Sequence, residues 1–321
     1  MKAGSVLQHV RACLPWATGA VLGMAAMPAQ AIVSSQNPAS WLGGGIDYLD
    51  GVGQLIVSRS DGNFGCSGSL IAGGQYVLTA AHCLSGDSGT LTTSSVALSF
   101  KGGSVTASAT EFYTHGGWTG DTSAGNDIAL IKLASAITSI DGYQFASGNV
   151  QGASVIIAGY GFVGTGASGF NANTFGTLRY GYNEYDASSL YYTQHAYSSS
   201  VYLYDFDSPA GSSSIFGSAG LGASEATIAP GDSGGATLVN VGGEWLLAGV
   251  HSFASCPSGY CPVDGRFGDI AGDTSVFAQS AWLQSYLPAA VPEAPSWAML
   301  MAGAGLLGGI ARRRNRTSAR P

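Results

Sequence analysis

The sequence is short of charged residues, and of basic residues above all. Only 10% of its 321 residues are Asp, Glu, Lys or Arg, with 12 basic against 19 acidic side chains. Helical bundles and coiled coils need faces rich in Lys and Glu, so this composition disfavours both. The acidic balance also argues against nucleic-acid binding, which relies on Lys and Arg contacts to phosphate. A hydrophobic content of 45% is too high for a disordered chain.

Basic residues are scarcest in the middle of the chain and gather at its two ends. Two lie in the first 11 residues and five follow residue 311, which leaves only five between residues 32 and 291. The ends are therefore a different kind of sequence from the body.

The first 31 residues have the pattern of a secretory signal peptide. Lys2 and Arg11 precede a mostly apolar stretch, residues 12–26, and an Ala-x-Ala site ends at Ala31. This order predicts export and cleavage by signal peptidase after Ala31. An N-terminal anchor helix is the alternative, but the apolar stretch is short for a membrane span.

The last segment, residues 291–321, has a second targeting pattern. Pro292, Glu293 and Pro295 lie before a 15-residue apolar run, residues 297–311, which the arginine cluster follows. This order resembles the PEP-CTERM sorting signals of exported bacterial proteins, although Ala294 interrupts the Pro-Glu-Pro motif. The resemblance implies processing by an exosortase-type enzyme; a simple tail anchor is the alternative. Either way we expect the body in the periplasm, on the outer surface or outside the cell, with membrane contact through this segment before processing.

The cysteines agree with export. Apart from Cys13 in the signal segment, there are four, Cys66, Cys83, Cys256 and Cys261. An even number in an exported chain predicts two disulfides, with three connectivities open. No His lies at ligand spacing from either pair, so we expect no zinc site and no other metal.

The sequence pattern of the body, residues 32–290, predicts an all-β structure. Short runs rich in Val, Ile, Leu and Thr recur between turn residues, and helical periodicity is absent up to residue 275. We expect one closing helix over 276–287, and long loops and hairpins over 164–224. The expected strands are 54–58, 69–71, 76–80, 96–100, 127–133, 154–159 and 246–251.

Three motifs in this body carry the chemistry. His82 follows a β-rich run in Thr-Ala-Ala-His-Cys, Asp127 heads another in Asn-Asp-Ile-Ala-Leu, and Ser233 lies in Gly-Asp-Ser-Gly-Gly. Each alone is more often structural than catalytic. In this order the three resemble the trypsin/chymotrypsin-like serine proteases, which implies two antiparallel six-stranded β-barrels with a C-terminal helix.

The resemblance assigns roles to these residues. It makes Ser233 the nucleophile, His82 the general base and Asp127 the group that orients the imidazole. The backbone N–H groups of Gly231 and Ser233 would form the oxyanion hole. Ser252 would support Asp127, while the backbone of Phe253 and Ala254 would pair with the substrate.

The same resemblance implies a disulfide and a pocket specificity. It pairs Cys66 with Cys83 beside the histidine. Cys256 and Cys261 are five positions apart and would close a small loop at the pocket rim, whereas the family usually bridges that rim to the segment before the nucleophile, where this chain has Ala229. Thr227 stands where relatives that cleave after basic residues carry an aspartate, so a neutral residue before the scissile bond is expected. Asp269 or Asp273 remains an alternative source of an acid in that pocket.

Export and activation are connected in this interpretation. Cleavage after Ala31 would expose an Ile-Val start, and the new ammonium of Ile32 would pair with Asp232 as in activated family members. A plain N-terminal strand extension is the alternative. The sequence therefore predicts an exported serine endopeptidase that acts on polypeptides without a cofactor. The alternative is a catalytically inactive binding protein of the cell envelope or extracellular matrix.

Overall fold

The computed structural model describes residues 32–37, 40–71, 73–188, 191–192, 195–218, 220–256 and 263–287. Residues 1–31 and 291–321, for which targeting signals are expected, lie outside the described residues. The elements of the first half are β1 (Val33–Ser34), η2 (Asp47–Leu49), β2 (Val52–Arg59), β3 (Gly62–Leu70), β4 (Tyr76–Thr79), α1 (Ala81–Ser85), β5 (Thr93–Phe100), η3 (Lys101–Gly103), β6 (Val105–Thr114), η4 (Thr122–Ala124) and β7 (Ala129–Leu133). The second half contains β8 (Ser154–Gly159), β9 (Val163–Thr165), β10 (Gly169–Asn171), β11 (Arg179–Glu184), β12 (Ala187–Ser188), β13 (Tyr191–Tyr192), β14 (His195–Ala196), β15 (Val201–Asp205), η5 (Gly222–Ser224), β16 (Ala226–Thr227), β17 (Ala236–Val241), β18 (Glu244–Ser255), β19 (Ile270–Ser275) and α2 (Ser280–Gln284).

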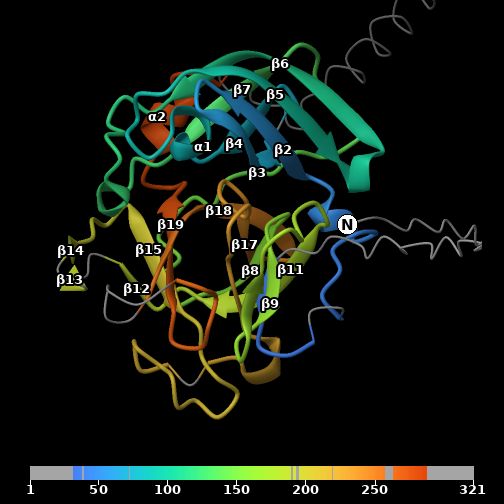
Figure 1. The fold of residues 1–321 in the computed structure, drawn as a ribbon. Helices are drawn as coiled ribbons and strands as arrows, with labels where there is room; N and C mark the ends of the chain where they lie inside the picture. The colour runs from blue at the N-terminus through green and yellow to red at the C-terminus, as the bar shows by residue number, and fades with distance from the viewer. Residues whose placement is uncertain are drawn as a thin grey trace, which may run out of the picture.

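The first half of the chain closes into a six-stranded antiparallel barrel. Its strands follow the order β2-β3-β4-β7-β6-β5, with β5 paired back to β2, and they form the upper part of the molecule in Figure 1. Strand β2 shows why: Leu55 and Val57 are fully buried inside the barrel, while Ile56 between them is 39% exposed. This alternation is the period of two expected of a strand with one face on a core.

The second half forms an open sheet rather than a second six-stranded barrel. Seven strands run in the order β11-β8-β17-β18-β19-β15-β12, and a four-stranded sheet, β10-β9-β1-β16, lies beside them. They occupy the lower part of Figure 1. The all-β trypsin-like fold is confirmed: the first half is a closed six-stranded barrel, and the described residues of the second half form a half-barrel. Within the described residues the last strand, β12, pairs through only two residues, so this edge ends without meeting β11.

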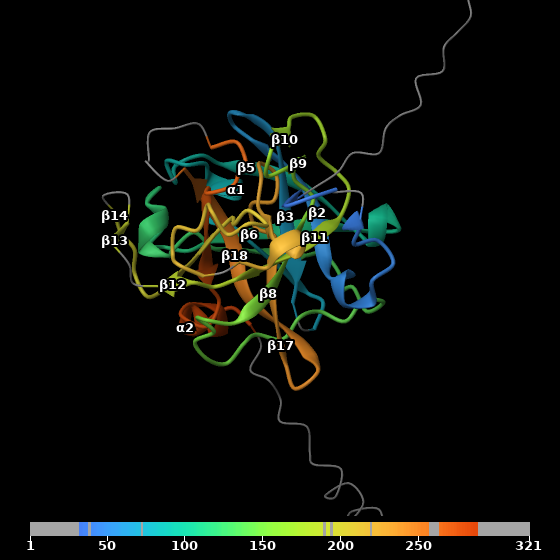
Figure 2. The ribbon, with the colours of Figure 1, turned by 90° about the horizontal axis from the view of Figure 1, so that it is seen from below.

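The two halves share one hydrophobic core. Leu55 and Leu130 of the first barrel belong to the same buried cluster as Ile156 and Leu238 of the second sheet. The view from below in Figure 2 shows β17 and β8 lying across the molecule beneath the first-barrel strands. Residues at the ends of strands from both halves are thereby brought together.

The closing helix packs against the first barrel. The ring of Trp282 meets His115 with centroids 5.2 Å apart, and Tyr286 meets Tyr113 at 4.6 Å. Helix α2 is shorter than the expected span of 276–287, since it covers only Ser280–Gln284. In the part of the chain that the structure describes, no helix has the length and hydropathy needed to span a membrane.

Candidate active site

His82 and Asp127 are brought together by a strand pair. Strands β4 and β7 run antiparallel, with Thr79 opposite Ala129, so His82 just after β4 and Asp127 just before β7 lie at the same edge. The Asp127 carboxylate accepts hydrogen bonds from His82 Nδ1 at 2.8 Å and from the His82 backbone N–H at 2.9 Å. Two bonds to one carboxylate fix both the position and the rotation of the imidazole.

Two further groups hold Asp127, which is fully buried. Ser252 Oγ donates to Asp127 Oδ2 at 2.5 Å. Thr274 Oγ1 donates to the Asp127 carbonyl oxygen at 3.1 Å. Sequence reasoning missed Thr274, because no local motif marks a residue 147 positions away along the chain.

The environment sets the charge state of His82. Burial, the largest single influence, disfavours the imidazolium, but the negative charge of Asp127 and its hydrogen bond outweigh it and raise the pKa of His82 above 6.5. The imidazole keeps contact with water, because its side chain is 17% exposed.

Ser233 lies in a tight loop that only glycines permit. Gly231 and Gly234 have φ of 95° and 79°, in the region that favours glycine. A Cβ at Gly234 would overlap Thr79 Oγ1 and the Ser67 carbonyl oxygen, so this position has room for no side chain. The Ser233 carbonyl oxygen accepts from the Ser67 N–H at 2.8 Å, which ties the loop to β3.

The predicted nucleophile and base belong to one cluster. Cys83 Sγ lies 3.6 Å from the Ser233 carbonyl oxygen and 4.0 Å from His82 Nε2. Among the described residues no hydrogen bond joins Ser233 Oγ to His82 Nε2. Such bonds are often long in proteins without bound substrate and shorten when substrate binds.

A disulfide fastens the histidine segment. Cys66 in β3 is bonded to Cys83 in α1, with Cα atoms 6.4 Å apart, as predicted. The bond links the barrel wall to the residue next to His82. The second predicted disulfide, Cys256–Cys261, involves Cys261, which lies outside the described residues.

The predicted activation pair is also adjacent in space. Asp232 is fully buried, and its carboxylate accepts from the backbone N–H groups of Gly161 at 2.7 Å and Ala229 at 2.9 Å. Burial raises the pKa of Asp232 to about 6, although these bonds and one from the Ile32 backbone N–H oppose the rise. Ile32 is itself only 1% exposed and has a φ of 63°.

A pocket of about 300 Å³ opens beside Ser233. The predicted substrate-binding residues Ser252, Phe253 and Ala254 line it, together with the apolar residues Phe170, Ile228, Ala229, Pro230 and Val263. Thr227 is not among the lining residues. It is buried in β16, opposite Val33.

Asp269 and Asp273, the two acids considered for this pocket, both have hydrogen-bond partners within the fold. Asp269 accepts from the backbone N–H groups of Gly265 at 2.9 Å and Arg266 at 3.1 Å. Asp273 is fully buried and pairs with His251 Nδ1 at 2.9 Å. Both carboxylates are therefore already bound to partners within the fold.

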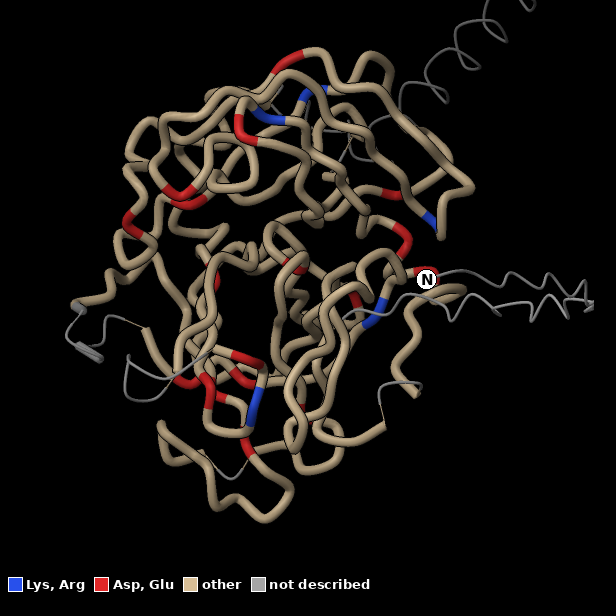
Figure 3. Tube along the Cα trace, in the orientation of Figure 1, with Lys and Arg blue, Asp and Glu red and all other residues tan. Residues whose placement is uncertain are grey.

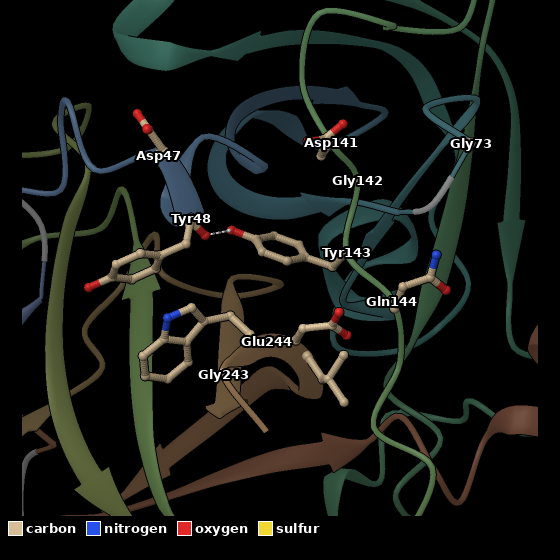
Figure 4. Close-up of a pocket in the computed structure, with 11 residues that line it drawn as sticks. Asp47, Tyr48, Gly73, Asp141, Gly142, Tyr143, Gln144, Gly243 and Glu244 are labelled. Atoms are coloured by element: carbon tan, nitrogen blue, oxygen red, sulfur yellow. Dashed lines mark hydrogen bonds between the residues drawn. The ribbon is translucent and has the colours of Figure 1, made fainter. Parts of the chain in front are cut away.

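A larger pocket than the one beside Ser233 lies elsewhere. It has a volume of about 680 Å³ and is lined by Tyr48, Tyr143 and Trp245 among others, with Tyr143 donating to the Tyr48 carbonyl oxygen at 2.9 Å (Figure 4). His82, Asp127 and Ser233 take no part in it. In Figure 3 the red Asp and Glu segments are more frequent along the described part of the chain than the blue Lys and Arg segments.

Among the described residues there is no group of three or more His, Cys, Asp or Glu side chains that could hold a metal ion.

Known proteins identify the class to which this fold and site belong. The family model described as Trypsin matches residues 44–267, and the chain belongs to that family. It is 34% identical over 120 residues to trypsin delta and to trypsin gamma of Drosophila melanogaster, covering 36% of this chain and 46% of each relative. It is 34% identical over 132 residues to trypsin Blo t 3 of Blomia tropicalis, covering 39% and 49%.

The chain thus spans about half the length of the curated relatives it matches. A solved structure described as HL collagenase superposes with a TM-score of 0.55 at 19% identity, covering 81% of this chain and 97% of that one. That likeness concerns the fold.

Proposed function

We propose that the protein is an exported serine endopeptidase that hydrolyses peptide bonds through His82, Asp127 and Ser233. The observation that carries the proposal is the hydrogen-bonded series Ser252–Asp127–His82 beside a glycine-bracketed serine and an apolar pocket. Membership of the trypsin family supports it.

In the proposed mechanism Ser233 Oγ attacks the scissile carbonyl while His82 removes its proton. This proton transfer is needed because a serine hydroxyl is a weak nucleophile until a base removes its proton. Asp127 keeps the imidazole in the required tautomer and stabilises the imidazolium that forms. His82 then protonates the leaving amine, and water hydrolyses the acyl-enzyme in the same way.

The backbone supplies the remaining groups. The N–H groups of Gly231 and Ser233 bind the oxyanion, where loss of one donor costs about 3 kcal/mol of transition-state stabilisation. The backbone of Phe253 and Ala254 pairs with the substrate chain before the scissile bond.

The pocket beside Ser233 should favour a neutral residue before the scissile bond. Burial of Arg or Lys without a counter-charge costs several kcal/mol, so we expect neutral side chains to be preferred by about 10²-fold or more. Matched peptides carrying Ala, Leu, Phe or Arg at that position test both peptidase activity and its preference. Faster cleavage after Arg would show that an acid lines the pocket.

Peptide hydrolysis should fail as the pH falls below the pKa of His82. Because that pKa is raised above the usual value of a histidine, the active neutral imidazole is lost at a higher pH than in a free histidine. Below the pKa each pH unit should lower kcat/KM by about tenfold, since the protonated base cannot accept the serine proton. Thermal unfolding over the same range controls for loss of fold. A flat profile from pH 8 to 5 would exclude His82 as the base.

Signal cleavage after Ala31 would also activate the enzyme in this account. The Ile32 N–H already points at the Asp232 carboxylate, and cleavage would turn it into an ammonium. A β-branched residue at φ 63° carries about 1–3 kcal/mol of strain, which cleavage would release because φ then loses its preceding peptide.

We therefore expect N-terminal sequencing of the exported protein to begin at Ile32. A protein that retains one glycine before Ile32 should lose most activity, because its amine cannot reach the buried carboxylate. A different mature N-terminus, or full activity of the extended protein, would reject this role for Ile32 and Asp232.

Export itself rests on the signal pattern of residues 1–31 and is supported by the Cys66–Cys83 disulfide, since such bonds persist in oxidising compartments. For residues 291–321 we propose sorting through an exosortase-type enzyme, with membrane contact before processing.

A further inference from the structure

The pocket drawn in Figure 4, with a volume of about 680 Å³, lies where the two halves of the fold meet. The residues that line it come from three parts of the chain: 47–48 and 73 in the first half, 243–246 at the hairpin that joins β17 to β18, and 141–144 in the segment between the halves. Pockets that bind ligands often lie at such junctions. None of these residues belongs to the proposed catalytic site.

Hydrogen bonds to both halves hold the walls of this pocket in place. The Tyr143 N–H donates to the Leu70 carbonyl oxygen at the end of β3, and the Gln144 carbonyl oxygen accepts from the Leu247 N–H in β18, both at 2.9 Å. The Tyr143 hydroxyl donates to the Tyr48 carbonyl oxygen at 2.9 Å. A ligand would therefore meet walls that are already ordered, which lowers the entropic cost of binding.

One wall of the pocket is aromatic. The rings of Tyr48 and Trp245 stack with their centroids 5.1 Å apart and an angle of 23° between their planes. Both residues line the pocket and both are only partly buried. The faces of such rings attract cations, and a planar guanidinium also stacks on them.

The charged residues that line the pocket are all negative. Asp47, Asp141 and Glu244 are exposed there, and no Lys or Arg is among the lining residues (Figure 4). Lys101 interacts with the charge of Asp47 from outside the pocket, but its ammonium is already paired with Asp50 at 2.6 Å. The pocket therefore offers three carboxylates and an aromatic wall to a positively charged ligand.

An arginine side chain matches both properties of the pocket. Its guanidinium is permanently charged, stacks on aromatic rings and forms paired hydrogen bonds with a carboxylate. Lysine matches the charge but lacks the planar group, and a neutral side chain matches only the aromatic wall. We propose that the pocket binds an arginine side chain of a polypeptide, away from the proposed catalytic residues. This binding does not depend on the proposed peptidase function.

Fluorescence anisotropy with matched peptides tests the proposal. The first probe is the peptide amide Gly-Ser-Gly-Arg-Gly-Ser, labelled with an uncharged fluorophore. The second carries citrulline in place of arginine, which keeps the shape of the side chain and removes its charge, and the third carries lysine. The protein carries Ser233→Ala, so that no probe is hydrolysed during the measurement.

We expect the arginine probe to bind about tenfold more tightly than the citrulline probe, with the lysine probe between them. The difference should shrink as the salt concentration rises, because the carboxylates are exposed to solvent. Equal affinity of the arginine and citrulline probes would show that the carboxylates take no part, and would overturn the proposal. So would the absence of binding by the arginine probe. Neither result bears on the peptidase proposal, because no hydrolysis is measured.

Variants that remove single charges locate the bound arginine. Glu244→Gln should lower the preference for arginine over citrulline to about threefold, and its combination with Asp141→Asn to about twofold or less. Both positions are exposed, so the fold should be little affected. Glu111→Gln is the matched control, because it removes the same charge from an exposed carboxylate that does not line the pocket. Retention of the full preference in the double variant, or its loss in the control, would contradict the proposal.

Discussion

Ser233→Ala is expected to lower kcat/KM for peptide hydrolysis by about 10⁴-fold or more while the protein remains folded. The substitution removes the oxygen that forms the acyl-enzyme, and no other group can replace it. The side chain is only partly buried, so unfolding free energy should change by about 0.5 kcal/mol or less. Steady-state kinetics with a cleavable peptide and urea denaturation measure the two effects.

The double variant is the sharper form of this test. His82→Ala should be nearly as damaging as Ser233→Ala, and the combination should add little, because the two residues act in one step. Multiplicative losses would indicate that they act independently, which would contradict the proposed triad.

Asp273→Ala is expected to lower the free energy of unfolding by about 3–5 kcal/mol. The buried carboxylate accepts from His251 Nδ1 at 2.9 Å, Tyr185 Oη at 2.6 Å and Thr237 Oγ1 at 2.5 Å. Its removal leaves three donors without an acceptor inside the second sheet, which is costlier than losing the bonds alone. Urea denaturation measures the loss.

Two further variants provide the controls. Asp273→Asn keeps one acceptor oxygen, so it should cost less than the alanine variant. Asp141→Ala removes an exposed carboxylate and should change stability by about 0.5 kcal/mol or less. A loss below about 1 kcal/mol for Asp273→Ala would show that this buried cluster does not hold the second sheet together.

The residues of the candidate site could be predicted where a short local motif marks them. The motifs around His82, Asp127 and Ser233 are short and specific, and the strand predicted over 154–159 coincides with β8. The structure brings His82 and Asp127 into direct contact, with Ser252 on the same carboxylate. The Cys66–Cys83 pairing followed from the family resemblance and was confirmed.

Features that depend on tertiary pairing were not predictable. The stretch 164–224 was expected to be loops and hairpins, yet it contains β11 and β15, both strands of the large sheet. In β11 Gly181, Asn183 and Glu184 surround the two tyrosines, and these residue types are depleted in strands, so the strand signal of the sequence is weak there. Strand β15 carries a five-residue buried run, Val201–Asp205, that length and composition could have marked as a strand.

Hydrogen-bond partners that lie far apart along the chain could not be predicted from the sequence either. Asp273 was considered only as an acid for the pocket, because nothing nearby along the chain indicates that His251, Tyr185 and Thr237 surround it. Arg59 likewise carries no motif, although it bonds the carbonyl of His82 from 23 residues away. Such contacts arise when barrel strands close, and strand order rather than local pattern decides them.

The most direct test of the central claim is labelling of the folded protein with an active-site fluorophosphonate, followed by mass spectrometry of its peptides. A serine activated by a neighbouring imidazole reacts, whereas an ordinary surface serine does not. The account predicts one adduct, on Ser233, that is lost at low pH and in His82→Ala. An intact fold with no adduct on Ser233 would contradict the peptidase assignment and favour the inactive binding protein instead.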